Sequence, residues 1–424
     1  MNISVIGAGY VGLVTAAGLA ELGHDVVCID RDQVTVSAIN NKTPLIHENG
    51  LSNILSRLVP KRLIATTDYK VITDTDLILI CVGTPSKPDG SINLRYIKNA
   101  AIGLGSVLSS KKGYHVVATR STIIPNTTKE VIIPIIERYA GNKVGFAYNP
   151  EFLQEGKAVQ AFFNPQRLII GELNKRAGNV LLKAFKDIPA AIFRTDLTTA
   201  EMIKYASNAF LATKISFINE IANICQRAGV DVYDVVKGLS FDYRIGGEFL
   251  NAGIGFGGSC LPKDVAALIY ASMNHFGYRP ELLRTVLDIN EMQPSKMIDI
   301  AESKLGSLRN KTIAVLGLAF KPNTDDIRNA PAIGIIKLLL AKGAVVRAYD
   351  PQALDNAKRV FPQRVDFCSS AAEAIADSDC VLIATEWDEF KNISLYHGKM
   401  VIDGRRALEP SKAKSICDYQ GVSW

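Results

Sequence analysis

A cysteine follows two adjacent glycines in the stretch GFGGSCLPKD, residues 255–264. We expect Pro262 to be the first residue of a helix formed by LPKDVAALIYASM, because proline is favoured at the first helical position. A thiolate is favoured at a helix N-terminus and beside a cation, here Lys263. Around Cys260 the sequence offers neither a partner cysteine for redox exchange nor a ligand cluster for zinc. We therefore expect Cys260 to be a nucleophile, with a plain structural turn as the alternative.

Polar residues at a spacing of four form a second group. NPEFLQEG at 149–156 contains Glu151 and Glu155, and KYASNAF contains Lys204 and Asn208 on one face of a helical pattern. Isolated pairs of this kind are usually solvated surface pairs. The strongly apolar flanks of Lys204 and Asn208 favour a functional site instead.

A glycine motif indicates the cofactor. Gly7, Gly9 and Gly12 form GAGYVG between a β-rich run and a helical pattern, a context typical of a dinucleotide-binding turn. Asp30 ends the next apolar strand, where a carboxylate accepts hydrogen bonds from the adenosine ribose hydroxyls and repels a 2′-phosphate. We expect NAD rather than NADP, although Arg31 could meet a 2′-phosphate. The alternative is a glycine turn with only a structural role.

A hydride acceptor combined with a nucleophilic thiol narrows the chemistry. A thiol does not help to oxidise an alcohol, but it converts an aldehyde into a thiohemiacetal, from which a second hydride leaves to give a thioester. Water then releases an acid. The combination predicts oxidation of a primary alcohol to a carboxylate, with two NAD consumed per substrate.

The elements that position these residues follow from hydrophobic periodicity. Non-alternating runs rich in Ile, Val and Leu predict a parallel sheet, at 63–66, 76–83, 114–122 and 143–150. Apolar residues at helical spacing continue from Thr198 to Gly229. A second strand-and-glycine unit begins at 311, and DSDCVLIATEW corresponds there to DTDLILICVGTP in the first half. Cys28, Cys81, Cys225 and Cys380 are expected in cores.

The bulk composition fits two or three globular domains. The chain has 424 residues, 48% hydrophobic and 21% charged, and a net charge of +6 with scattered basic residues, so nucleic-acid binding is not expected. We expect no secretory signal and no membrane span. Seven widely spaced cysteines without CxxC pairs favour a reducing compartment, and hence a cytoplasmic protein.

Several motifs occur in the order found in one family. GAGYVG, VGTP, RST, NPEFLQEG, KYASNAF, GFGGSCLPKD and AFKPNTDDIR resemble the UDP-glucose/GDP-mannose dehydrogenase family from end to end. The resemblance implies two Rossmann-like, doubly wound parallel-sheet domains joined by a long helix and a helical middle domain. The implied boundaries are 1–197 for NAD binding, 198–300 for the helical, dimerising part and 301–424 for UDP-sugar binding.

The resemblance also implies catalytic residues: Cys260, Lys204, Asn208, Asp264, Glu155 and Thr122. Cys260 matches the family's nucleophile. Lys204 matches the lysine that stabilises a developing oxyanion, and Asn208 an oxyanion donor. Asp264 and Glu155, together with the RST threonine, match groups associated with activation of water.

Two binding sets complete the implied site. The cofactor set is Gly7, Gly9, Tyr10, Val11, Gly12, Asp30, Thr84, Thr122, Glu155, Lys263 and Arg328. The substrate set is Glu151, Phe152, Leu153, Lys204, Asn208, Arg244, Phe249, Leu250, Asn251, Gly257, Lys321 and Arg405. In the family, the residue that matches Arg244 reaches a neighbouring subunit's substrate, which implies at least a homodimer.

Two positions depart from the family pattern. Thr35 stands where the family commonly has a basic residue that helps to hold the cofactor phosphate, and HENGL at 47–51 replaces YEPGL. RIGGEFLNAGIGFGGSC and TEWDEF resemble the UDP-glucose branch, so UDP-glucose is the expected substrate.

Three alternatives stay open. The first is the same chemistry on GDP-mannose or a UDP-N-acetylhexosamine. The second is a two-electron 3-hydroxyacid-type dehydrogenase. The third is a non-catalytic protein that binds nucleotide sugars.

Overall fold

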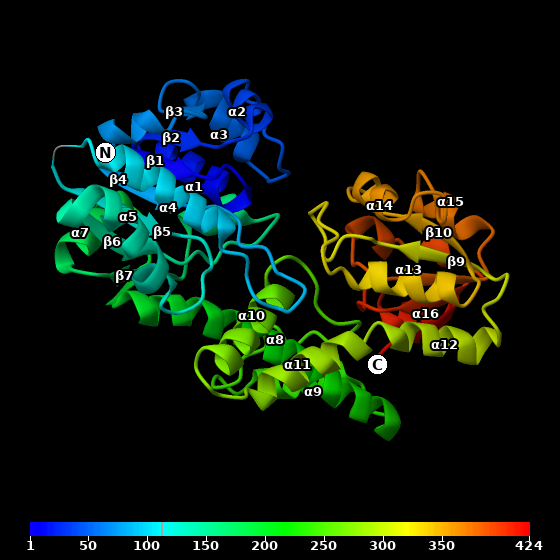
Figure 1. The fold of residues 1–424 in the computed structure, drawn as a ribbon. Helices are drawn as coiled ribbons and strands as arrows, with labels where there is room; N and C mark the ends of the chain where they lie inside the picture. Colours follow the sequence, from blue (N-terminus) through cyan, green and yellow to red (C-terminus); the bar gives the residue numbers. More distant parts are fainter. Residues whose placement is uncertain (112) are drawn as a thin grey trace. The chain divides into compact units, whose positions relative to one another are not determined.

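A computed structural model describes residues 1–111 and 113–424. The chain forms two compact units, Met1–Ser207 and Asn208–Trp424. Each unit contains one β-sheet with helices packed against it (Figure 1). We describe each unit by itself.

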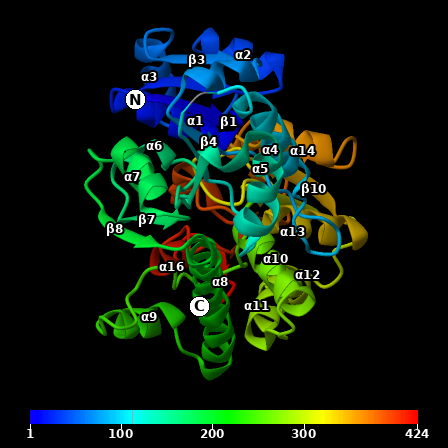
Figure 2. The same ribbon diagram turned by 60° about the vertical axis from the view of Figure 1, so that its left-hand side comes forward.

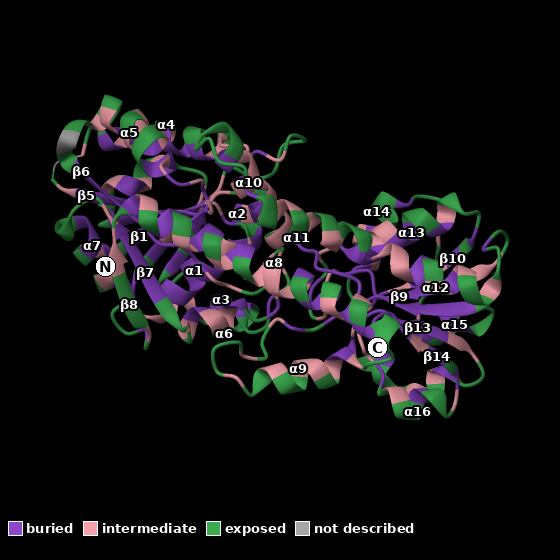
Figure 3. Cartoon of the chain, turned by 90° about the horizontal axis from the view of Figure 1, so that it is seen from below, coloured by how far each residue is buried: buried purple, intermediate pink, exposed green. Residues whose placement is uncertain are grey.

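The first unit is built on a sheet that has eight strands in the described residues. In spatial order they are β3 (Leu63–Thr66), β2 (Asp25–Ile29), β1 (Asn2–Ile6), β4 (Leu77–Ile80), β5 (His115–Thr119), β6 (Val144–Tyr148), β7 (Arg167–Glu172) and β8 (Ala191–Thr195). The central strand β1 pairs in parallel with β2 and β4, so that Ile3 lies opposite Val26 and Leu77. The apolar side chains of the inner strands β1, β4, β5 and β6 are buried on both faces, as expected for a sheet between two helical layers (Figure 3).

The runs predicted at 63–66, 76–83, 114–122 and 143–150 form parallel strands, but the sheet continues beyond them with a strand of the opposite direction. Strand β7 pairs antiparallel with β6, and β8 runs parallel to β7. The segment between β6 and β7 carries only the short helix α6 (Ala158–Phe163). It returns the chain from the carboxyl end of β6 without a crossover, and an antiparallel partner is the result.

The helical elements of the first unit are α1 (Tyr10–Glu21), α2 (Gln33–Asn40), α3 (Leu51–Leu58), η1 (Tyr69–Asp74), α4 (Arg95–Leu108), η2 (Thr128–Ile132), α5 (Ile133–Ala140), η3 (Gly141–Lys143), α6 and α7 (Lys175–Ala184). The packing of α1 is close, because a Cβ added to Gly18 would lie 2.3 Å from the ring of Phe162 on α6. Helix α6 is thereby fixed against the helix that follows the glycine turn.

The long helix α8 (Leu197–Ala228) has 32 residues and spans the boundary between the units (Figure 2). The prediction of a helix from Thr198 to Gly229 is confirmed within one residue at each end. Gly229 has φ +69°, a conformation that glycine adopts without strain and that ends an α-helix.

In the described part of the second unit, four α-helices follow α8 and precede a second sheet. The helices are α9 (Val232–Ser240), α10 (Leu261–Asn274), α11 (Glu281–Met292) and α12 (Ser295–Leu305). All strand pairs of this sheet are parallel. The spatial order is β11 (Asp366–Phe367), β10 (Val345–Tyr349), β9 (Thr312–Leu316), β12 (Cys380–Ile383), β13 (Met400–Asp403) and β14 (Asp418–Gly421).

The second sheet has a doubly wound order, with helical elements α13 (Pro331–Ala341), α14 (Leu354–Val360), α15 (Ala371–Ala376), η4 (Asp388–Lys391), η5 (Ile393–Tyr396) and α16 (Pro410–Lys414). The expected fold class, two Rossmann-like domains with a helical middle region, is confirmed. Among the described residues, no helix has the length and apolar character that crossing a membrane requires.

Candidate active site

Helix α8 carries two buried polar side chains one turn apart, Lys204 and Asn208. Lys204 Nζ donates to the backbone carbonyl of Glu151 at 2.6 Å and lies 3.1 Å from Glu151 Oε1. It also lies 5.2 Å from the centre of the Phe152 ring, close enough for a cation–π contact. The alternative of a solvated surface pair is wrong for these residues, because Glu151, Lys204 and Asn208 are all buried.

The Glu151 carboxylate is kept ionised by its neighbours. Burial would raise the pKa of Glu151, but the Lys204 ammonium and the Leu153 N–H, which donates to Oε2 at 2.7 Å, outweigh burial and lower it. Arg120 acts in the same direction. Its buried guanidinium donates to Thr15 Oγ1 at 3.1 Å and to the side chain of Asn149. The first unit thus holds a buried carboxylate between two cations.

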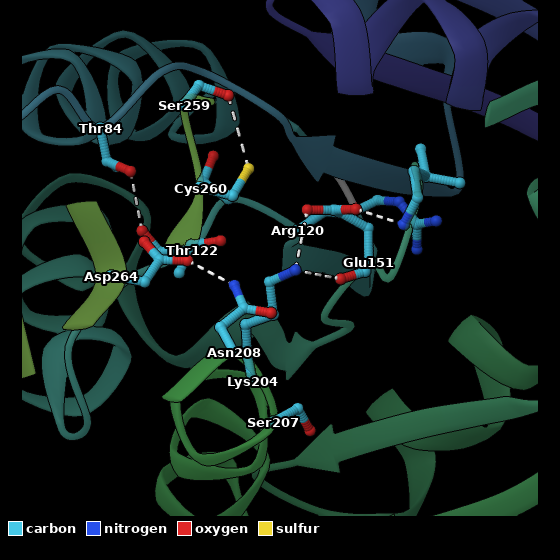
Figure 4. Close-up of polar contacts among 12 residues, drawn as sticks. Thr84, Arg120, Thr122, Glu151, Lys204, Ser207, Asn208, Ser259, Cys260 and Asp264 are labelled. Atoms are coloured by element: carbon cyan, nitrogen blue, oxygen red, sulfur yellow. Dashed lines mark hydrogen bonds and ion pairs between the residues drawn. The ribbon is translucent and has the colours of Figure 1, made fainter. Parts of the chain in front are cut away.

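A second polar group lies in the second unit, near the start of α10. Asn208 Nδ2 donates to Asp264 Oδ2 at 2.6 Å (Figure 4). Lys263, which we expected beside the thiol, forms an ion pair with the other oxygen of Asp264. Cys260 is the N-cap residue of α10, and its exposed Sγ lies 3.5 Å from Ser259 Oγ. The thiol therefore lies at the positive end of a 14-residue helix dipole, as the sequence predicted.

The glycine turn after β1 has the geometry that a dinucleotide requires. Gly7 has φ +96°, and a Cβ on Gly12 would lie 1.8 Å from the Gly7 carbonyl oxygen, so these two glycines are needed to build the turn. A Cβ on Gly9 would meet no atom within 4 Å. Gly9 caps α1, so open space lies at the helix N-terminus where a pyrophosphate would bind. The chain therefore fits the expected cofactor.

The carboxylate after β2 lies beside this turn. Asp30 Oδ2 accepts from the Ala8 N–H at 2.7 Å, and Oδ1 accepts from the Asp32 N–H at 3.0 Å. Arg31 stacks on the Tyr96 ring, with 5.0 Å between Cζ and the ring centre. Asp32 caps α2 by accepting from the Val34 N–H at 3.0 Å, and the Thr35 hydroxyl donates to the other oxygen of the same carboxylate at 2.8 Å. Thr84, on the loop after β4, donates to the Thr122 carbonyl at 2.9 Å.

The corresponding carboxylate in the second sheet is fully occupied within the protein. Asp350 follows β10 and accepts from the N–H groups of Leu318 and Ala319, at 2.7 and 3.0 Å, and from Trp387 Nε1 at 3.1 Å. It is completely buried. An adenosine ribose could not reach it, which explains physically why a second strand-and-glycine unit need not bind a dinucleotide.

The glycine-rich loop before Cys260 packs closely on the second sheet's connections. Cβ atoms added to Gly253 and Gly257 would each lie 2.3 Å from a backbone oxygen, that of Gly404 and that of Asn329 respectively. Arg405 donates to the Gly255 carbonyl at 2.8 Å, and the Gly258 N–H donates to the Arg328 carbonyl at 2.8 Å. The glycines thus permit close backbone packing, and Arg405 helps to hold the loop.

The remaining substrate and cofactor candidates lie around this loop or on the surface. Leu250 is buried in an apolar cluster with Ile218 and Val232, so a ligand could reach only its backbone. Arg328 pairs with Asp326, and the Lys321 ammonium lies 5.5 Å from the Phe320 ring centre. Asn251 is exposed, and Phe249 has a positive φ of +63°. Arg244 is also exposed and forms an ion pair with Asp242.

Three polar residues that support the site were not identified from the sequence. Asn290 on α11 bonds both the N–H and the carbonyl of Phe256, at 2.7 and 3.0 Å. Glu201 on α8 accepts from the N–H groups of Asn126 and Thr128, in the loop after Thr122. The third is Glu48. Each acts on a segment distant in sequence, so local spacing carried no signal for them.

Comparisons with known proteins agree with this geometry. Three models of the UDP-glucose/GDP-mannose dehydrogenase family match consecutive segments: the NAD binding domain at residues 1–189, the central domain at 198–292 and the UDP binding domain at 314–410.

Curated relatives match over nearly the whole chain. The chain is 46% identical to the UDP-glucose 6-dehydrogenase AglM of Haloferax volcanii, covering 96% of this chain and 97% of that protein. It is 44% identical to the UDP-glucose 6-dehydrogenase YwqF of Bacillus subtilis, covering 97% and 95%.

Solved structures match as well. A UDP-glucose dehydrogenase from Pyrobaculum islandicum is similar with a TM-score of 0.96 at 40% identity, covering 100% of this chain and 98% of that one. A UDP-D-ManNAc dehydrogenase from Pyrococcus horikoshii has a TM-score of 0.87 at 29% identity, covering 100% and 99%.

Proposed function

The chain belongs to the UDP-glucose/GDP-mannose dehydrogenase family, and we propose that it oxidises the C6 alcohol of UDP-glucose to the carboxylate of UDP-glucuronate with two molecules of NAD. The observation that carries this proposal is the exposed Cys260 thiol at the N-terminus of α10, in a chain that also has a dinucleotide turn. The domain limits 1–197, 198–300 and 301–424 are part of the proposal.

The residues of the chain have distinct tasks in this reaction. When bound, NAD supplies the hydride acceptor for both oxidations. The Cys260 thiolate adds to the aldehyde carbon to give a thiohemiacetal, and loss of hydride from that carbon leaves a thioester. Attack of water on the thioester carbonyl releases the carboxylate and restores the thiol.

The negative charge that develops on the substrate oxygen during the reaction is stabilised by hydrogen-bond donors. Lys204 and Asn208 provide an ammonium and an amide N–H from adjacent turns of α8. Glu151 holds the Lys204 ammonium in place through its carbonyl and its carboxylate. Asp264 orients the Asn208 amide by accepting its hydrogen bond. In this proposal Asp264, Glu155 and Thr122 also activate the attacking water.

Relatives favour UDP-glucose as the substrate. Those named UDP-glucose 6-dehydrogenase are 46% and 44% identical to this chain, whereas the UDP-D-ManNAc dehydrogenase is 29% identical. A dehydrogenase for GDP-mannose or a UDP-N-acetylhexosamine is the second candidate. A panel of nucleotide sugars separates these activities.

The test counts NADH. Purified protein is mixed with limiting UDP-glucose and excess NAD, and absorbance is followed to completion. We expect two NADH per sugar. The Cys260→Ala variant should lose acid formation, while a control that truncates a buried thiol on α8, Cys225→Ala, should keep it. One NADH per sugar in the wild type, or full acid formation by the Cys260 variant, would refute the double oxidation.

We also propose that the chain forms a homodimer and that it is located in the cytoplasm. Phe210, Phe217 and Ile224 recur every seven residues along α8 and are 64%, 49% and 59% exposed. A stripe with this spacing is typical of helix pairing, and a second copy of α8 is the simplest partner. Sedimentation of the wild type and of Phe217→Glu tests the dimer, which should dissociate in the variant.

A further inference from the structure

Glu48 is a buried carboxylate far in sequence from every proposed catalytic group, in the turn between α2 and α3. Its Oε1 accepts from the Ala158 N–H at 2.7 Å, and its Oε2 accepts from the Gly156 N–H at 2.8 Å. The hydroxyl of Tyr10 donates to the same Oε2. Both oxygens are therefore occupied by donors from two other segments.

The first of these segments is the loop that carries Glu151 and Glu155. Gly156, which follows Glu155, has φ +81°, and the Lys157 N–H bonds the Gln154 carbonyl at 2.9 Å, so Glu155 lies inside a tight turn. Lys157 is the N-cap of α6 but provides no side-chain cap. The N–H groups at the start of a helix need acceptors from outside it, and the Glu48 side chain provides one for the Ala158 N–H of α6.

The other end of the same loop is also held. Lys204 Nζ donates to the backbone carbonyl of Glu151, and the Leu153 N–H donates to the Glu151 carboxylate. Glu48 is the corresponding anchor at the Gly156 end. The position of Glu155 between the two anchors therefore depends on both of them.

The second segment is the dinucleotide turn. Tyr10 is the first residue of α1 and belongs to GAGYVG, whose glycines form the expected pyrophosphate site. The Tyr10 hydroxyl also accepts from the Gly156 N–H at 2.8 Å. A shift of the turn or of the N-terminus of α1 when NAD binds would thus be transmitted to the Glu155 turn through the contacts among Tyr10, Glu48 and Gly156.

We propose that Glu48 is a positioning residue that, with Tyr10, couples binding of NAD to the conformation of the loop that carries Glu151 and Glu155. This inference rests on the proposed function of that loop. Its consequence is thermodynamic coupling, since a cofactor that fixes the loop also strengthens binding of the sugar nucleotide, and the effect is reciprocal.

Calorimetry on the full chain tests the coupling without turnover. The dissociation constant of UDP-glucose is measured with and without saturating NADH, for the wild type, Tyr10→Phe, Glu48→Gln and the double variant. NADH should tighten UDP-glucose binding in the wild type, and each single variant should reduce this tightening at least threefold. The double variant should behave like Glu48→Gln, because both changes break the same connection.

Tyr114→Phe is the matched control, because its hydroxyl bonds Asn174 and not the loop. It should keep the wild-type coupling. Equal coupling in the wild type and in both single variants would overturn the inference. If Glu48→Gln does not fold, Tyr10→Phe decides alone, since it leaves both backbone bonds to Glu48 intact. A wild type that binds neither ligand would instead refute the proposed function.

Discussion

Replacing Glu201 by glutamine should change how the stability of the chain depends on pH. Glu201 lies on α8 one turn before Lys204, and its carboxyl is completely buried. It accepts from the Asn126 N–H at 2.7 Å and from the Thr128 N–H at 2.9 Å. It thereby ties α8 to the loop that follows Thr122.

The size of the effect follows from the pKa of this group. Burial raises the pKa of Glu201 from 4.5 to about 7, although the donors of Thr128 and Asn126 act in the opposite direction. The folded chain therefore binds the proton more tightly than the unfolded chain does. Each unit of pKa is worth about 1.4 kcal/mol, so the difference corresponds to about 3 kcal/mol.

The contribution of Glu201 to folding stability changes with pH in the direction opposite to that of a salt-bridged carboxylate. Glu201 stabilises the fold most below pH 4.5, where it is protonated in both states, and this contribution is lost as the pH rises from 4.5 to about 7. Above pH 7 the group is ionised in both states and no further change follows. Glutamine cannot titrate, so Glu201→Gln should lack this slope.

Urea unfolding of both proteins at pH 5, 6, 7 and 8 measures the effect. All other titrating groups are common to the two proteins, so the difference between their unfolding free energies isolates Glu201. The wild type should lose about 2.5 kcal/mol relative to the variant between the extremes of this range, most of it below pH 7. A difference that stays constant over the range would refute this account of the buried carboxyl.

Three other changes give sharp outcomes. Lys204→Met should lower the free energy of unfolding by about 3 kcal/mol at pH 7, because it leaves the buried Glu151 carboxylate without its ammonium partner; urea unfolding measures this, and an unchanged midpoint would contradict the pairing. Gly12→Ala should lower the melting temperature because its Cβ would lie 1.8 Å from the Gly7 carbonyl oxygen, whereas Gly9→Ala should keep the melting temperature and weaken NAD binding in a fluorescence titration. Asn208→Asp places a second carboxylate against Asp264, where the amide now lies at 2.6 Å, so one of the two should have a raised pKa and the acidic limb of the kcat profile should move to higher pH; an unmoved limb would exclude this contact from the reaction.

Local patterns in the sequence were sufficient for the parts of the fold that depend on neighbouring residues. The glycine turn and Asp30 are separated by a fixed βαβ length, and the apolar periodicity of residues 198–228 marks α8 within one residue at each end. Pro262 correctly marked a helix start after Cys260, although it is the second residue of α10 rather than the first. These features require only propensity and spacing, which a single sequence contains.

Tertiary structure decided what depends on segments far apart in the chain. The strand runs did not show that β7 reverses direction, since a short run has no orientation until its partner is known. Spacing did not show that Glu48 caps α6 from 110 residues away, nor that Glu201 holds the loop after Thr122. A buried carboxylate needs donors, and only the folded backbone determines which N–H groups lie within reach.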